Sequence, residues 1–458
     1  MELFKLQNNF LLTIFYNYVI FKILFIIFQI IGVLMRFHQI RDWVTKQIDI
    51  KKPFRHVYLW YIFSLMVTTR KHSLNYAATL SGLNKSQFSK MLSNDKKVAF
   101  FTLDSLSKKQ SKKLSKSIKS YKTLHTRWPI VIIMDATLQK RSSMKTDNVQ
   151  KFNHGQGYVI GHQWTNIVLY INDFIIPLAP IPFYTKAYCK ANGLTYMTEH
   201  DRLAEYLKNL NLEDYIGTHI SKDVIVLADS GYDCKKIQNT ILERKWHFII
   251  ALMNSRTVKS EAKFARTPKS SDWDQVEPFF KDQRYLGWKT IRILTGSPKK
   301  KRLEYRIRHT IAFLKGVGKA QLVCSEFKKR PKGRRKYLAC SDLKAQPRQI
   351  IIGYRLRWKI EVFHKHVKMH LGFEDVATKR FRSIEAHVHF VYCAYILLHS
   401  GPPGVPENAK TIIEKQHYIQ IILDNKETAH DLQLATQIGG FEKLKNKLKS
   451  KLNSAVGF

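Results

Sequence analysis

Two short apolar runs, each leading into an aspartate, dominate the hydrophobic pattern of the chain. The stretch "PIVIIMDATLQ" leads to Asp135, and the stretch "DVIVLADSGYD" leads to Asp229. Continuous apolar runs of this length that are rich in β-branched residues predict strands buried on both faces. We therefore expect two buried strands, each ending on a carboxylate.

The neighbouring stretches predict the rest of a mixed α/β region. "YVIGHQWTNIVLYIN" and "DFIIPLAPIPFY" predict two strands that form a meander with the first, and "HFIIALMN" predicts a later strand. Thr198–Asn209 and Cys234–Lys245 have helical patterns. Residues 256–338 are rich in Lys, Arg, Pro and Gly and contain strand-like pieces such as "WKTIRILTG" and "YRIRHTIAFL". This segment is interpreted as an insertion.

Residues 36–122 have a helical and basic pattern. Within them, Ser73–Leu92 predicts two short helices around Gly82, with Ser86 as the cap of the second helix. The expected apolar face consists of Ala77, Leu80, Leu83 and Phe88. A helix-turn-helix motif would expose Lys85, Gln87 and Lys90 to DNA, although any helical hairpin shares this pattern. The basic run Lys108–Lys122 is a solvated linker or a phosphate-contacting arm.

The first 35 residues are a separate, apolar leader. Lys22 divides Phe10–Leu34 into two runs that are each shorter than the ~18–20 residues needed to span a membrane. The first alanine of the chain is Ala77, so no cleavage site of the secretory type follows the leader. The leader is a mis-assigned start preceding Met35, a membrane segment or a buried helix.

The net charge of the chain indicates which class of molecule it binds. Of 458 residues, 77 are Lys or Arg and 35 are Asp or Glu, which gives a formal net charge of +42. Such an excess favours a polyanionic partner, and nucleic acid is the usual one, with an anionic membrane surface as the alternative. The five cysteines include no C-x-x-C pair, which argues against a zinc finger or a disulfide framework and favours a reducing cytosol.

A third carboxylate stands in the basic segment "YRLRWKIEVFHKHVK". If Gln346–His370 forms one helix, four polar residues fall within about 60° of arc. They are Tyr354, Arg357, Glu361 and Lys368. An apolar stripe of Leu356, Ile360, Phe363, Val367 and Leu371 lies beside them. A surface helix in which Glu361 pairs with Arg357 or Lys365 would have the same pattern.

The three acids together suggest a site for hard cations. Carboxylates at the ends of adjacent buried strands meet at one edge of a sheet, and a helix can add a third. Mg²⁺ prefers carboxylate and water oxygens, and paired ions can promote phosphoryl transfer. Asp135 or Asp229 alone would be an ordinary residue of a turn after a strand.

The spacing Tyr354-x2-Arg357-x3-Glu361-x6-Lys368 resembles the signature around the third acid of DDE-type bacterial insertion-sequence transposases. "VIIMDAT" and "VLADSGYD" are similar to the family's first and second acid blocks, and "YLACSDL" is similar to the strand before its third acid. The resemblance covers about residues 125–400.

This resemblance implies an α/β fold: a ribonuclease-H-like mixed sheet with flanking helices and a β-rich insertion before the catalytic glutamate. The helical and basic pattern of residues 36–122 adds a helical N-terminal DNA-binding region to this fold. Asp135, Asp229 and Glu361 would be catalytic residues that hold two Mg²⁺ ions, for which Mn²⁺ can substitute. The DNA-binding residues would be Tyr354, Arg357, Lys365 and Lys368, besides Lys85, Gln87 and Lys90 of the hairpin. Trp273 and Trp288 are candidates for stacking on a flipped base.

The expected domain organisation has six parts. They are a leader (1–35), a helical DNA-binding region (36–122), the first part of the catalytic core (123–255), the insertion (256–338), the second part of the core (339–400) and a helical tail (401–458).

The predicted activity is cut-and-paste transposition by a cytoplasmic, nucleoid-associated enzyme. It would act on double-stranded DNA, both element terminal repeats and target, as a homodimer. Hydrolysis would free a 3′-hydroxyl that attacks a second phosphodiester, so Tyr354 is not expected to be a nucleophile. The alternatives are a non-catalytic DNA-binding relic, a ribonuclease-H-like nuclease acting on RNA or junctions, and a membrane-anchored basic protein.

Overall fold

The computed structural model describes residues 38–48, 50, 55–67, 71–116, 128–155, 157–218, 224–261, 273–282, 286–294, 302–329 and 335–437. The chain divides into two compact units, residues 1–71 with 397–458 and residues 72–396. The second unit contains the three predicted acids. The apolar stretch Phe10–Leu34 and the end of the basic run, residues 117–122, lie outside the described residues. The six predicted domain boundaries stay a prediction.

The larger unit is built on one sheet, which has thirteen strands in the described residues. Its main order is β2-β3-β1-β6-β7-β13-β12-β11-β8-β9, and β4, β5 and β10 pair at its sides. The strands are β1 (Ile130–Lys140), β2 (Gln150–His154), β3 (Gly157–Ile171), β4 (Phe174–Pro177), β5 (Ile181–Pro182), β6 (Val224–Ala228), β7 (His247–Ala251), β8 (Thr257–Ser260), β9 (Asp274–Gln275), β10 (Lys289–Leu294), β11 (Arg302–Leu314), β12 (Gly318–Phe327) and β13 (Lys336–Cys340).

Helices of both units account for most of the remaining described residues. They are an N-terminal helix at 38–47, α2 (Arg55–Met66), α3 (Leu74–Ser81), α4 (Lys85–Asn94), α5 (Lys96–Lys116), α6 (Lys186–Ala191), α7 (Glu199–Asn209), α8 (Glu213–Ile216), α9 (Lys235–Glu243), α10 (Val276–Asp282), α11 (Pro347–Arg355), α12 (Trp358–His370), α13 (Phe381–His399) and α14 (Ile412–Gln437). None of the described helices is both long and apolar enough to cross a membrane.

The central strands of the sheet are formed by the continuous apolar runs of the sequence. β1 pairs antiparallel with β3 and parallel with β6, and β6 pairs parallel with β7. Every residue of β6 is buried, as are the first five residues of β1. Strands that are covered on both faces lose the alternation of polar and apolar residues, which explains the continuous apolar runs. The predicted strands and the meander of β1, β3 and β4 are confirmed.

The expectation that the first strand ends on its acid was wrong. β1 continues five residues beyond Asp135 to Lys140, because this second half stays paired with β3 from Asp135↔Asn166 to Lys140↔Gly161. Only the parallel pairing with β6 stops earlier, at Ile133↔Leu227.

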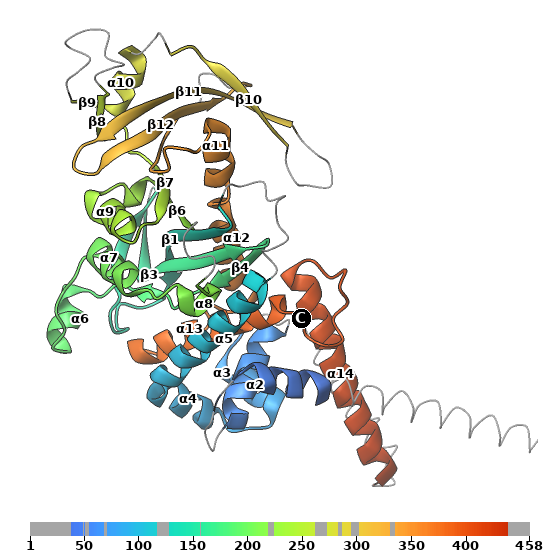
Figure 1. Ribbon diagram of the computed structural model, residues 1–458. Coiled ribbons are helices and arrows are strands. Elements are labelled where there is room, and N and C mark those ends of the chain that lie inside the picture. Colours follow the sequence, from blue (N-terminus) through green and yellow to red (C-terminus); the bar gives the residue numbers. More distant parts are fainter. Residues whose placement is uncertain are drawn as a thin grey trace, which may run out of the picture. The chain divides into compact units, whose positions relative to one another are not determined.

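The segment predicted as an insertion continues the sheet. β8 to β12 lie with α10 at one end of it (Figure 1), and β13 joins them to the core by pairing with β12 on one side and β7 on the other. α11, which follows β13, packs closely on β7. A Cβ atom on Gly353 would lie 3.0 Å from Ile249 Cδ1 and 3.1 Å from a ring carbon of Trp128.

The predicted single helix over Gln346–His370 is divided into α11 and α12. At Leu356 and Arg357 the backbone amides bond to the carbonyls three residues earlier, Gly353 and Tyr354, at 3.0 Å each. This tighter turn separates α11, which packs on β7, from α12, which packs on β1 and β4. Four residues of the predicted apolar stripe are fully buried, whereas Leu356, at the turn, is half-buried.

The helical hairpin forms with one difference in its caps. Ser73 caps α3, and Gly82 ends it in a left-handed conformation (φ +70°) that favours glycine. The predicted cap of α4 was wrong: Asn84 is the cap and accepts a hydrogen bond from the backbone amide of Ser86, which is the second residue of the helix. The basic run becomes the end of α5 as far as Lys116.

The close approach of β1 to β3 gives a test of the register. A Cβ atom on Gly161 would lie 2.1 Å from the Gln139 carbonyl oxygen, a backbone atom that cannot move aside. We expect Gly161→Ala to lower the free energy of unfolding by about 1–3 kcal/mol in urea titrations. Gly157→Ala is the matched control in the same strand, since a Cβ atom there meets nothing within 4 Å. Equal effects of the two substitutions would contradict the register.

Candidate active site

Asp135 and Asp229 occupy equivalent positions on adjacent parallel strands. The last parallel pair is Ile133↔Leu227, and each aspartate lies two residues beyond it. One oxygen of each carboxylate accepts a local backbone hydrogen bond, from Ala136 to Asp135 Oδ1 (3.0 Å) and from Gly231 to Asp229 Oδ1 (2.8 Å). These bonds orient the carboxylates and leave the second oxygen of each available.

Asp229 begins a sharp turn that follows β6. It caps the short 3₁₀ helix Ser230–Tyr232. Tyr232 is buried, and its hydroxyl donates to Glu199 Oε1 at 2.8 Å, so the turn is anchored to the start of α7. β6 ends at Ala228, so Asp229 is the first residue after the strand and the cap of the turn, not the last residue of the strand as predicted.

The third acid reaches the same place from α12. Arg357 Nη1 lies 3.8 Å from Asp135 Oδ2, and Arg357 Nη2 makes a close ion pair with Glu361. The guanidinium is thus between the first and third acids. The Asp135 and Glu361 side chains are 17% and 30% exposed, so the site is open to solvent despite its depth.

Burial and like charge perturb Asp135. Burial raises the pKa of Asp135 to about 7, and the negative charges of Asp229 and Glu361 add to this, whereas Arg357 opposes it. Asp135 therefore lies within electrostatic range of both other acids. A positive charge placed among them would therefore be stabilised.

The donor chemistry of the three acids fits a hard divalent cation. Backbone hydrogen bonds already orient Asp135 and Asp229, and carboxylate oxygens are the ligands that such a cation prefers. In the arrangement described, however, no three acidic, histidine or cysteine side chains of the described residues form a ready-made metal cluster. Glu361 instead forms an ion pair with Arg357.

The other residues of the signature surround this centre to different degrees. Tyr354 is buried on α11, and its pKa is raised by burial while Arg357 opposes the shift. Lys368 is half-buried, and burial lowers its pKa. Lys365 is exposed. Tyr354, Arg357 and Lys368 therefore lie around the acids, whereas Lys365 faces solvent.

A buried polar chain behind Asp135 was missed in the sequence. Tyr392 of α13 bonds to Asn166 of β3, which bonds to His364 of α12, and His364 Nδ1 lies 4.0 Å from Asp135 Oδ2. Burial lowers the pKa of His364 to about 3, with the charges of Lys368 and Arg357 contributing. His364 follows Glu361 by three residues, which is one signal that could have been used. Asn166 has no signal apart from its register opposite Asp135.

The two candidate tryptophans differ in accessibility. Trp273 is 44% exposed. Trp288 is covered by guanidinium groups, whose central carbons lie 4.9 Å (Arg306), 4.8 Å (Arg308) and 5.5 Å (Arg335) from the ring centroid. Of the two rings, Trp273 is the better placed to meet a base.

The predicted DNA-binding residues of the hairpin lie on α4. Lys85 and Lys90 are exposed and Gln87 is half-buried, while Phe88 on the other side of the helix is completely buried. The helix therefore presents a basic face to solvent.

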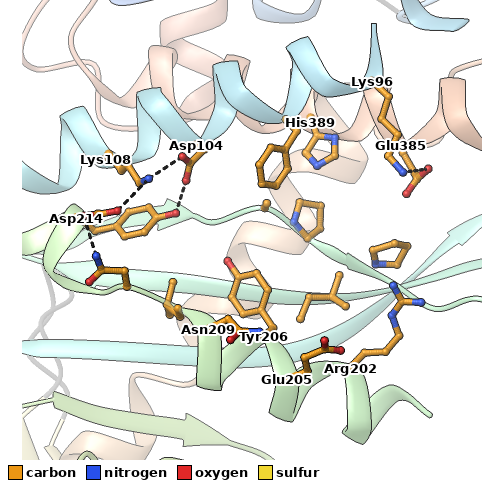
Figure 2. A pocket seen from close by; sticks show the side chains of 18 of the residues that line it. Lys96, Asp104, Lys108, Arg202, Glu205, Tyr206, Asn209, Asp214, Glu385 and His389 are labelled. Carbon is orange, nitrogen blue, oxygen red and sulfur yellow. Dashed lines mark hydrogen bonds and ion pairs between the residues drawn. The ribbon is translucent and has the colours of Figure 1, made fainter. Parts of the chain in front are cut away.

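A pocket of about 570 Å³ lies away from the acids, between α5, α7, the turn before β5, and α13 (Figure 2). Its charged side chains neutralise one another. Lys96 pairs with Glu385 at 2.6 Å, and Lys108 pairs with Asp104 at 2.9 Å and Asp214 at 3.3 Å. With Arg202 and Glu205 the lining has three basic and four acidic side chains, so the pocket lacks the excess positive charge that would attract a polyanion.

A known protein family matches the part of the chain that contains the three acids. The family described as "Transposase DDE domain" matches residues 129–397, which is more than half of the chain. The comparison with curated proteins gives no match.

The perturbed acid makes the stability of the protein depend on pH. Because the pKa of Asp135 is about 7 in the folded state and 3.8 ordinarily, the folded state binds the proton more tightly, and stability falls as pH rises from about 4 to about 7. We expect Asp135→Asn to raise the free energy of unfolding in the presence of a chelator, by about 2 kcal/mol more at pH 8 than at pH 5. Asp42→Asn, at an exposed position, is the control. An effect of Asp135→Asn that is independent of pH would contradict the pKa.

Proposed function

The chain belongs to the family of transposases with a DDE domain, and from this premise we propose that it cuts the ends of an insertion element and joins them to target DNA. In the first step, water attacks a phosphodiester at the element end, and a 3′-hydroxyl is released. In the second step, this hydroxyl attacks another phosphodiester, so that one P–O ester bond forms while another breaks and the displaced oxygen leaves as a new 3′-hydroxyl. The observation that supports the proposal is the approach of Asp135, Asp229 and the Arg357–Glu361 pair to the point where the parallel pairing of β1 and β6 ends.

The order of the central strands supports a ribonuclease-H-like core. An antiparallel meander, β4-β3-β1, is followed in space by two strands parallel to β1, namely β6 and β7. Asp135 lies on β1, and Asp229 directly follows β6. Glu361 lies on α12, which packs on β1. All three acids thus come from rigid elements.

Asp135, Asp229 and Glu361 are the residues that would hold two Mg²⁺ ions, with Mn²⁺ as a substitute. When bound, the ions would supply activation of the attacking oxygen and stabilisation of the leaving oxygen. The backbone bonds to Asp135 and Asp229 keep the carboxylates oriented before substrate arrives. The ion pair of Arg357 with Glu361 offsets part of the repulsion among the acids while no substrate is bound.

Arg357, Tyr354 and Lys368 would contact DNA phosphates beside the acids. The Arg357 guanidinium is well suited to this, because its fork geometry matches a phosphate as well as a carboxylate. Lys365 is exposed on the same helix and would contact the phosphate backbone farther out. Burial lowers the pKa of half-buried Lys368, while Glu374 and Asp135 oppose the shift, and a phosphate would further stabilise the charged form.

The hairpin of α3 and α4 would bind the terminal repeats through Lys85, Gln87 and Lys90. Two exposed lysines on one helix provide phosphate contacts, and the net charge of +42 favours association with DNA in general. Because two element ends are cut together, the active form would be a homodimer on DNA, associated with the nucleoid.

One observation favours a second candidate, a DNA-binding protein without catalysis. In the described residues no three potential ligands form a metal cluster, and Arg357 is bound to Glu361. Such a protein would bind element ends but would not cleave them in Mg²⁺ or Mn²⁺.

Cleavage assays separate the two candidates. Purified protein with Mn²⁺ should nick DNA that carries the sequences flanking this reading frame. Asp229→Asn and Glu361→Gln should reduce the rate on the order of 10²-fold or more while DNA binding in gel-shift assays persists. Glu205→Gln, an exposed carboxylate of α7, is the control and should cleave normally. Binding without nicking by the unchanged protein would favour the non-catalytic candidate.

The hairpin assignment has its own test. Lys85→Ala and Lys90→Ala should each weaken binding to element ends and lower the slope of log affinity against log salt by about 0.9 for each lost phosphate contact. Lys190→Ala, at an exposed position on α6, is the matched control. An unchanged salt slope in both α4 variants would remove α4 from the interface.

A further inference from the structure

Behind Asp135 lies a buried line of three polar side chains that come from three different elements. Tyr392, Asn166 and His364 are 0%, 1% and 8% exposed. Asn166 lies directly opposite Asp135 in the β1–β3 register. A polar chain in such a position is costly unless each member is satisfied, so its hydrogen-bond directions are informative.

The direction of the first bond follows from Tyr392. Its hydroxyl is completely buried and lies 2.6 Å from Asn166 Oδ1, and among the described residues Asn166 is its only hydrogen-bond partner. If the amide were reversed, the phenol hydrogen would be buried without an acceptor, which costs about 1–3 kcal/mol. Tyr392 is therefore the donor and Asn166 Oδ1 the acceptor.

The second bond then fixes the tautomer of His364. With Oδ1 facing Tyr392, the Asn166 amide nitrogen Nδ2 faces His364 Nε2 at 2.8 Å and donates to it. A ring nitrogen that accepts cannot carry the proton of the neutral ring, so the proton is on Nδ1. Nδ1 lies 4.0 Å from Asp135 Oδ2, which is beyond direct hydrogen-bond distance. Oδ2 is the oxygen that the Ala136 amide does not contact.

We propose that His364 is a positioning residue for the transposase reaction. Its Nδ1–H group, whose tautomer is set by Asn166 and Tyr392, would act on the Asp135 carboxylate from 4.0 Å through its dipole, not through a direct hydrogen bond. The inference rests on the proposed function, since it assigns Asp135 a catalytic role. A neutral donor steadies the second carboxylate oxygen without placing a further positive charge beside Arg357. Outer partners of this kind typically change metal affinity or activity by about 10–100-fold.

Two substitutions at His364 separate positioning from mere packing. Asn places its amide nitrogen near the position of Nδ1 and keeps a donor toward Asp135. Gln places its amide near the position of Nε2 and keeps the contact with Asn166. If His364 only satisfies the buried Asn166, His364→Gln should be the milder change. If it positions Asp135, His364→Asn should be the milder one.

The measurements use the full chain without DNA and then with it. In protein labelled with ¹⁵N-histidine, long-range ¹H–¹⁵N correlation spectra should show the His364 proton on Nδ1, with the signal identified by its loss in His364→Asn. Titration with Mn²⁺ alone, followed by electron paramagnetic resonance, should give His364→Asn an affinity within a few-fold of the unchanged protein. His364→Gln should lose about 10–100-fold in affinity, with a parallel loss of nicking.

The outcomes distinguish this inference from the proposed function. A proton on Nε2, or a His364→Gln variant that binds Mn²⁺ and nicks DNA as well as His364→Asn does, would overturn the role of His364 alone. An unchanged protein that neither binds Mn²⁺ nor nicks element-end DNA would overturn the proposed function and this inference with it. Urea unfolding of both variants checks that the order of their activities does not follow the order of their stabilities.

Discussion

Repulsion between two carboxylates is the constraint around which the site is arranged. The register of β1 and β6 places Asp135 and Asp229 at the same level of neighbouring parallel strands, and the surrounding sheet prevents them from separating. The pKa of Asp135 is raised mainly by burial, and the negative charge of Asp229 adds to this shift. The guanidinium of Arg357 offsets part of the repulsion between the carboxylates. Because Arg357 also forms an ion pair with Glu361, the three acids together still favour a further positive charge. In this view the fold stores an unfavourable charge arrangement that substrate and ions would relieve.

The strands were predictable because burial on both faces leaves an unbroken apolar run, and the sequence also showed which acids follow these runs. The extension of β1 beyond Asp135 was not predictable. Gln139, in this second half, is completely buried because its side chain bonds to the Phe373 carbonyl oxygen and to the Trp164 indole, 3.1 Å away. A polar residue that is satisfied by distant partners looks, in the sequence, like a residue of a loop.

The linear spacing from Tyr354 to Lys368 was sufficient to indicate the third acid, because that part of the site lies on nearly continuous helix. Two features of the site could not be predicted from the sequence. The tighter turn at Leu356 and Arg357 depends on two helices packing on different strands, and the partner of His364 lies 198 residues away on β3. Register between distant strands is set by tertiary packing, so residues such as Asn166 cannot be identified from local patterns.

The position of β13 bears on how chains of this kind tolerate shortening. β13 is held between β7 and β12, so the strands that interrupt the catalytic region also cover an edge of the sheet that carries it. Excision of β8 to β12 would leave the backbone donors and acceptors of one side of β13 bare, and an uncovered edge invites pairing between molecules. A truncated form would need another element, such as a helix or a charged bulge, to protect this edge of β13 and prevent association between molecules.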